Sequence, residues 1–78
     1  MRRVVVYTAA DCGLCERALE VVNGVREEVA FALEVVDIGG DLGLEARYRE
    51  HLPVIEIDGE RAFTYFVDAE ALRARLSA

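Results

Sequence analysis

Two runs of β-branched residues, separated by an amphipathic segment, most constrain the fold of this chain. The first run, Val4–Tyr7, carries no charge and is typical of a central strand covered on both faces. The second run is Ala32–Ile38. Between them, apolar residues recur at helical spacing: Cys15, Ala18, Leu19, Val22, Val25 and Val29. The order strand, helix, strand predicts a βαβ unit with parallel pairing.

The predicted helix runs from about Gly13 to Glu28. Gly24 is its weak point, because a glycine in a helix interior costs about 1 kcal/mol relative to alanine. An alternative is that Gly24 ends the helix early. The apolar spacing continues through Val25 and Val29, which favours the longer helix.

Four further elements are predicted after the break at Gly39-Gly40. They are a short helix, two strands joined by a hairpin turn at Asp58-Gly59, and a closing helix capped by Asp68. Their ranges are Leu42–His51, Val54–Ile57, Arg61–Phe66 and Ala69–Leu76. Residues 1–78 then form one α/β domain of order β-α-β-α-β-β-α, with a four-stranded mixed sheet and helices on both faces.

Length, charge and hydropathy exclude several classes of function. A chain of 78 residues has room for one hydrophobic core. Nine basic and fifteen acidic residues give a net charge of −6, which argues against a nucleic-acid partner. The longest uncharged run, Val4–Ala10, has seven residues, whereas a membrane-spanning helix needs about 20. We therefore expect a monomeric, cytoplasmic protein with no nucleic-acid or membrane partner.

The two cysteines, Cys12 and Cys15, stand at the expected junction of the first strand and the first helix. They are too close together to cross-link the fold, so their role is chemical or metal-binding. The free N–H groups and the dipole at a helix N-terminus stabilise a thiolate. Such a site lowers the thiol pKa below the free value of about 8.5. Arg17 favours the Cys12 thiolate and Asp11 opposes it.

Different positions on the helix predict different roles for the two thiols. Cys12 is expected at the exposed cap, and Cys15, about one turn later, is expected to face the core. This arrangement predicts a dithiol–disulfide oxidoreductase, in which Cys12 attacks a substrate disulfide and Cys15 resolves the mixed disulfide. The Cys12–Cys15 disulfide is then the redox centre, and no metal or other cofactor is expected.

Two stretches of the chain resemble the signatures of a known family. Leu52-Pro53-Val54 precedes Ile57-Asp58-Gly59, and Val5-Val6-Tyr7-Thr8 leads into Asp11-Cys12-Gly13-Leu14-Cys15. On these residues the whole chain resembles the thioredoxin fold, and within it the short glutaredoxin-like proteins of bacteria. The resemblance implies that Pro53 is cis and packs against the cysteines, and that Leu52 offers its backbone to an extended substrate. Asp68 matches the family's acidic helix cap, although plain capping of the helix is the favoured interpretation.

The chain departs from the glutaredoxin pattern on both sides of the expected site. Ala9-Ala10-Asp11 stands where a basic or polar residue usually precedes the cysteines, and Phe63-Thr64 stands where the family carries Gly-Gly. Bulky side chains obstruct the close approach that glycines allow, and Asp11 would repel a glutathione carboxylate. These differences count against glutathione. The expected partners are a disulfide-bearing substrate, protein or small molecule, and an electron donor that is either a reductase or glutathione. The residues expected to border the substrate are Asp11, Leu52, Pro53 and Asp68.

Three alternative functions stay open on the sequence. Small heavy-metal carriers also place C-x-x-C between a strand and a helix, where two thiolates bind Cu(I) or Zn²⁺. Such domains carry Met two residues before the first cysteine, where this chain has Ala10, and they end in a strand. The other two alternatives are an iron–sulfur cluster shared by two chains through Cys12, and a binding module without redox activity.

Other residues near the expected site have simpler interpretations. His51, the only histidine, is expected to be solvated at a turn. The alternatives for His51 are an effect on the Cys12 thiolate or a metal ligand. The aromatic residues are assigned to core or sheet packing: Tyr7, Phe63, Tyr65 and Phe66.

Overall fold

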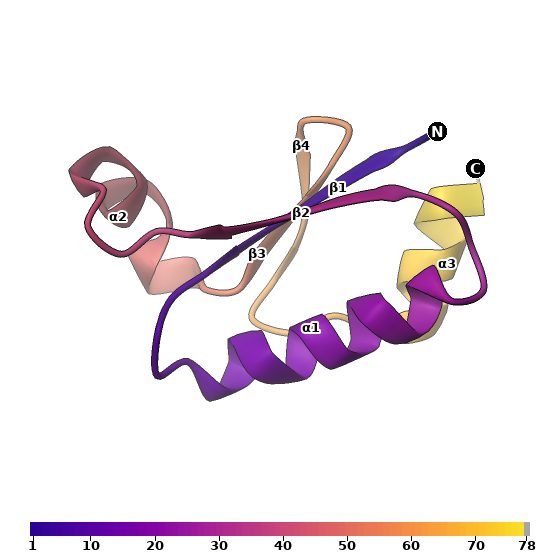
Figure 1. The fold of residues 1–78 in the computed structure, drawn as a ribbon, viewed down its shortest axis with the longest axis horizontal. Coiled ribbons are helices and arrows are strands. Elements are labelled where there is room, and N and C mark those ends of the chain that lie inside the picture. The colour runs from indigo at the N-terminus through magenta and orange to yellow at the C-terminus, as the bar shows by residue number, and fades with distance from the viewer. Residues whose placement is uncertain (78) are drawn as a thin grey trace.

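The computed structural model describes residues 1–77 and contains the predicted order of elements, β-α-β-α-β-β-α (Figure 1). A short 3-10 helix, η1 (Arg49–His51), precedes the third strand. No helix within residues 1–77 is long and apolar enough to cross a membrane. In chain order the elements are β1 (Arg3–Thr8), α1 (Gly13–Arg26), β2 (Ala32–Asp37), α2 (Leu42–Tyr48), β3 (Val54–Ile57), β4 (Glu60–Thr64) and α3 (Ala69–Ser77).

β1 is a central strand of the sheet, whose order is β2-β1-β3-β4. It pairs in parallel with β2, with Val4 opposite Leu33, so the predicted βαβ unit is confirmed. It pairs antiparallel with β3, with Val6 opposite Ile55, and β3 pairs antiparallel with β4. The turn between β3 and β4 is Asp58-Gly59, whose φ angles of 52° and 86° suit the tight hairpin predicted there. The sheet is therefore mixed, as expected.

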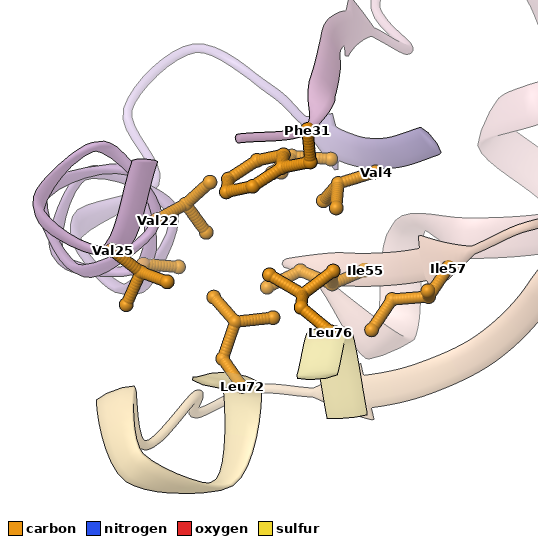
Figure 2. Packing of buried hydrophobic residues seen from close by; sticks show 10 residues of the cluster. Val4, Val22, Val25, Phe31, Ile55, Ile57, Leu72 and Leu76 are labelled. Carbon is orange, nitrogen blue, oxygen red and sulfur yellow. The ribbon is translucent and has the colours of Figure 1, made fainter. Parts of the chain in front are cut away.

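One face of the sheet, together with α1 and α3, forms the main hydrophobic core (Figure 2). Side chains alternate along a strand, so Val4 and Val6 of β1 point to the same face as Ile55 and Ile57 of β3. α1 and α3 lie together against this face (Figure 1). The helices and the segment before β2 complete the core with Ala18, Val22, Val25, Phe31, Leu72 and Leu76.

A smaller core of buried residues connects α2 with β3 and the start of α1. α2 lies near one end of the sheet, on the other side of the strands from α1 (Figure 1). Tyr48, the last residue of α2, is buried and stacks on Tyr7 of β1, with ring centroids 4.1 Å apart. Its hydroxyl donates a hydrogen bond to Glu56 of β3 at 3.0 Å. Helices thus lie on both faces of the sheet, as predicted. The buried residues of this smaller core are Cys15, Ile38, Tyr48, Leu52 and Val54.

Three predicted boundaries are wrong by a few residues. α1 ends at Arg26 instead of Glu28, and Gly24 lies exposed inside the helix without ending it. The predicted helix Leu42–His51 is divided into α2 and η1. β4 ends at Thr64 instead of Phe66, because Tyr65 has a φ of +64°, which turns the backbone out of the strand.

Candidate functional site

Cys12 and Cys15 form a disulfide at the N-terminus of α1, with their Cα atoms 5.2 Å apart. Cys12 is the N-cap of the helix, in an extended conformation. The main-chain N–H of Cys15 donates to Cys12 Sγ at 3.2 Å, so the sulfur occupies the place of a capping oxygen. The sulfur therefore meets one of the N–H groups that a helix leaves unpaired at its start.

The two cysteines differ in their access to solvent. Cys12 is partly exposed, whereas the side chain of Cys15 has 1% of its surface exposed. Cys15 is buried in the smaller core, alongside Tyr48 and Leu52. A large partner can consequently reach the sulfur of Cys12 and not that of Cys15. This is the asymmetry expected for an attacking and a resolving thiol.

The segment that leads into α1 bends at Asp11. This residue is exposed and has a φ of +58°, a conformation in which aspartate is several-fold enriched. Asp11 therefore has a structural reason to precede Cys12, apart from its charge. Arg17, on the second turn of α1, is exposed and makes no hydrogen bond or ion pair with any residue between 1 and 77.

Leu52 belongs to the same buried cluster as Cys15, although the two are far apart in sequence, and Pro53 follows Leu52 directly. The peptide bond between Leu52 and Pro53 is cis, as the family resemblance implies. Pro53 is buried, and the side chain of Leu52 is 9% exposed and belongs to the same core as Cys15. A role for the Leu52 backbone in binding an extended substrate stays a prediction.

Tyr65 donates two hydrogen bonds to the segment that contains Leu52 and Pro53. Its main-chain N–H donates to the carbonyl oxygen of Pro53 at 3.0 Å, and its hydroxyl donates to the carbonyl oxygen of Glu50 at 3.0 Å. The Nδ1 atom of His51 lies 3.1 Å from the same hydroxyl. A tyrosine hydroxyl has one hydrogen, which Glu50 receives, so the His51 nitrogen donates to the Tyr65 oxygen.

Tyr65 is the residue that the sequence analysis missed. Phe63 and Thr64, expected in the place of the family's Gly-Gly, lie within β4, and Phe63 packs against the main core. The backbone bend that favours glycine falls on Tyr65 instead. Tyr65 and Phe66 are 41% and 73% exposed, so their assignment to core packing is wrong. The solvated state expected for His51 is also wrong, because His51 is half-buried and bonded to Tyr65.

Asp68 caps α3. Its Oδ2 accepts a hydrogen bond from the main-chain N–H of Ala71 at 3.0 Å, which confirms the predicted cap. The carboxylate is exposed. A role for Asp68 in substrate binding stays a prediction.

A metal ion would find few ligands at this site. Among residues 1–77, no three histidine, cysteine or acidic side chains come together in a way that holds a metal ion. A structural zinc site uses four ligands, so Cys12 and Cys15 supply at most half of one.

The match to a family model decides which proteins this chain is related to. The model described as "Glutaredoxin-like domain (DUF836)" matches residues 3–77. The chain belongs to this glutaredoxin-like family. An uncharacterised protein of Mycobacterium tuberculosis, Rv0508, is 30% identical over 80 residues, which cover 96% of this chain and 82% of that protein.

Solved structures of similar proteins share the fold over nearly the whole chain. XcR50 of X. campestris is 34% identical with a TM-score of 0.79, and the match covers 95% of both chains. Ne2328 of Nitrosomonas europaea is 30% identical with a TM-score of 0.81, covering 96% of this chain and 91% of that one. A thioredoxin mutant from Halobacterium salinarum, 22% identical, has a TM-score of 0.72 and covers 97% and 72%. The fold is thioredoxin-like, and with the Cys12–Cys15 pair it supports a redox role.

Proposed function

We propose that this glutaredoxin-like protein is a dithiol–disulfide oxidoreductase that reduces disulfides of other proteins in the cytoplasm. The observation that carries the proposal is the disulfide between a partly exposed Cys12 at a helix cap and a buried Cys15. A reducing compartment supplies the dithiol form that such a reaction starts from. We expect its reduction potential to lie between about −270 and −200 mV, the range from thioredoxin to the glutaredoxins.

The reaction begins with the reduced protein. The Cys12 thiolate attacks one sulfur of the substrate disulfide, that bond breaks, and the other substrate sulfur leaves with the electron pair and takes up a proton. Cys15 then loses its proton and attacks Cys12 Sγ in the mixed disulfide. The second substrate thiol is released, and the Cys12–Cys15 disulfide remains, as observed. Two electrons have moved from the protein to its substrate. Of the two protons that the substrate thiols take up, one is lost by Cys15 and the other comes from solvent, to which Cys12 released its own proton on forming the thiolate.

The cap geometry favours Cys12 as the attacking group. The Cys15 N–H that meets Cys12 Sγ at 3.2 Å is a donor aimed at the sulfur that bears charge when the protein is reduced. The positive end of the α1 dipole acts in the same direction. We therefore expect the Cys12 thiol pKa to lie below the free value of about 8.5.

The Leu52-Pro53 segment supports an extended substrate. Leu52 belongs to the same buried cluster as Cys15, and an incoming peptide is proposed to pair with its backbone. In pairing of this kind the peptide lies extended and forms main-chain hydrogen bonds with the protein, which do not depend on the peptide's side chains. Leu52 and Pro53 are then the residues that align the substrate disulfide with Cys12.

The electron donor that we favour is a reductase acting directly on the Cys12–Cys15 disulfide. Phe63-Thr64 stands where the family carries Gly-Gly, and the bulky Tyr65 and Phe66 follow directly. The acidic Asp11 precedes Cys12. Bulky residues hinder the close backbone approach of a tripeptide, and Asp11 disfavours its carboxylates. Glutathione is the competing donor.

Turnover of an insulin disulfide with two donor systems tests the proposal. One system contains glutathione with glutathione reductase, and the other contains thioredoxin reductase alone, without thioredoxin. We expect reduction with the reductase alone, loss of turnover in Cys12→Ser, and full turnover in Asn23→Ser, a serine control at an exposed site on α1. Full activity of Cys12→Ser would contradict the mechanism, and efficient turnover with glutathione alone would contradict the choice of donor.

A further inference from the structure

A groove lies between α1 and the segment 65–67 that joins β4 to α3. The α1 wall consists of Leu14, Arg17, Ala18 and Val21, which recur at helical spacing and so share one side of the helix. The opposite wall is residues 65–67. The groove is open to solvent and has a cavity volume of about 70 Å³.

The groove is continuous with the site of the proposed reaction. Leu14 stands between the two cysteines in the chain. On the other wall, Tyr65 is bonded through its N–H to the carbonyl oxygen of Pro53. Each wall of the groove thus contains a residue joined directly to the site: Leu14 to both cysteines along the chain, and Tyr65 to Pro53 through a hydrogen bond.

The size and lining of the groove indicate what it holds. Pockets for whole small molecules have volumes of about 300–1,000 Å³. This groove is several times smaller, so it suits a single side chain. Its walls are aliphatic and aromatic, and Phe66 is 73% exposed at one of them. Arg17 is the one charged residue of the lining, and no residue between 1 and 77 pairs with it. In a chain of net charge −6, an arginine without an ion-pair partner supplies a local positive charge that can attract an acidic group.

We propose that this groove binds one large apolar side chain of an extended polypeptide substrate, next to the cysteine that reacts with Cys12. Arg17 binds a carboxylate of the same polypeptide. This inference rests on the proposed function and adds the class of substrate to it. Glutathione has no large apolar side chain, so its binding would bury no such group in the groove. The burial of an apolar side chain is therefore a physical reason for the protein to prefer polypeptides.

Chromogenic peptide disulfides test the proposal. Each peptide carries one cysteine joined to 2-nitro-5-thiobenzoate, so every peptide has the same leaving group. The residue beside the cysteine is Phe or Ser, and the next is Glu or Gln. The second-order rate constant of a single turnover with the reduced protein is measured. We expect the Phe peptide to react about tenfold faster than the Ser peptide, a usual discrimination for an apolar pocket.

Variants assign this preference to the groove. Phe66→Ala should reduce the ratio of the Phe to the Ser rate to near one. Leu42→Ala, which removes an 85% exposed leucine outside the groove, should keep the ratio. Arg17→Gln should abolish the preference for Glu over Gln and keep that for Phe. Arg17→Lys should keep the preference for Phe and retain part of the preference for Glu. Phe66 is exposed, so we expect unchanged thermal unfolding of Phe66→Ala.

The outcomes separate this inference from the proposed function. Equal rates for the Phe and Ser peptides with the wild-type protein would overturn the groove and leave the oxidoreductase intact. Failure of every peptide to react would overturn the oxidoreductase itself. A wild-type dimer in sedimentation that Phe66→Ala dissociates would also overturn the inference, because a second copy of the chain would then be the occupant.

Discussion

The main-chain N–H of Tyr65 donates a hydrogen bond to the carbonyl oxygen of Pro53 at 3.0 Å. This bond joins the cis-proline segment beside Cys15 to the turn between β4 and α3. The Tyr65 hydroxyl makes two further hydrogen bonds, one with the Glu50 carbonyl oxygen and one with the His51 ring. The position of Leu52 relative to the disulfide thus depends on one tyrosine from a different part of the chain.

Tyr65→Phe removes the two hydroxyl contacts and keeps the ring and the N–H. We expect the free energy of unfolding to fall by about 1 kcal/mol, because a net hydrogen bond contributes about that much. The amides of residues 50–53 should exchange with solvent faster, while those of β1 change only by the global effect. His51→Ala, which removes one contact, should have a smaller effect. Unchanged exchange at residues 50–53 in Tyr65→Phe would show that the hydroxyl does not hold the segment.

Leu72→Ala tests the main core that positions α1 and α3. Leu72 is fully buried, and deletion of a buried leucine side chain costs about 2–5 kcal/mol. Leu42→Ala is the same chemical change at a leucine that is 85% exposed, and we expect a cost within about 0.5 kcal/mol. Urea unfolding of both variants measures the difference. Similar losses in the two variants would contradict the packing in Figure 2.

Ionisation of Tyr48 should make the free energy of unfolding depend on pH in the alkaline range. Burial raises the pKa of Tyr48 to about 12, and hydrogen bonds with Tyr7 and Glu56 act in the same direction. In the unfolded chain this tyrosine ionises near 10, so its contribution is complete below pH 10 and is lost as pH rises toward 12. Urea unfolding at pH 9 and pH 11 should show this loss. In Tyr48→Phe the loss should be smaller, and an equal loss would rule out Tyr48 as its source.

Metal binding separates the redox function from the metal-carrier alternative. Cys12 and Cys15 are the thiols present, and no cluster of three ligands occurs within residues 1–77. We expect Zn²⁺ added to the reduced protein to be removed by gel filtration with a chelator, and the purified protein to be colourless. Retention of one Zn²⁺ or Cu(I) per chain would favour a carrier, and visible absorption would favour an iron–sulfur cluster.

The sequence predicts those elements whose burial is evident from the charge and apolar spacing of their own residues. Val4–Tyr7 is uncharged because β1 is central, and the apolar spacing from Cys15 to Val25 marks the side of α1 that faces the sheet. The position of Cys12 at the helix cap follows from the same pattern. These local signals were sufficient for the topology and for the cysteine pair.

Contacts between distant segments were beyond the reach of such signals. The end of β4 depends on the positive φ of Tyr65 and its bond to Pro53, which lies twelve residues earlier. The exposure of Phe66 was missed because an apolar residue at the end of a strand is ordinarily buried. The environment of His51 likewise depends on the Tyr65 hydroxyl, which is supplied by tertiary structure.

Trapping of a mixed disulfide tests the central claim, that Cys12 attacks and Cys15 resolves. Reduced Cys15→Ser is mixed with a peptide disulfide, and the intact mass of the protein is measured. We predict a stable adduct of one peptide per chain, linked to Cys12, whereas the wild-type protein should carry no adduct and should end as the Cys12–Cys15 disulfide. Cys12→Ser should react slowly or not at all, because Cys15 is 1% exposed. Adduct formation through Cys15 in Cys12→Ser, at the rate seen for Cys15→Ser, would contradict the account.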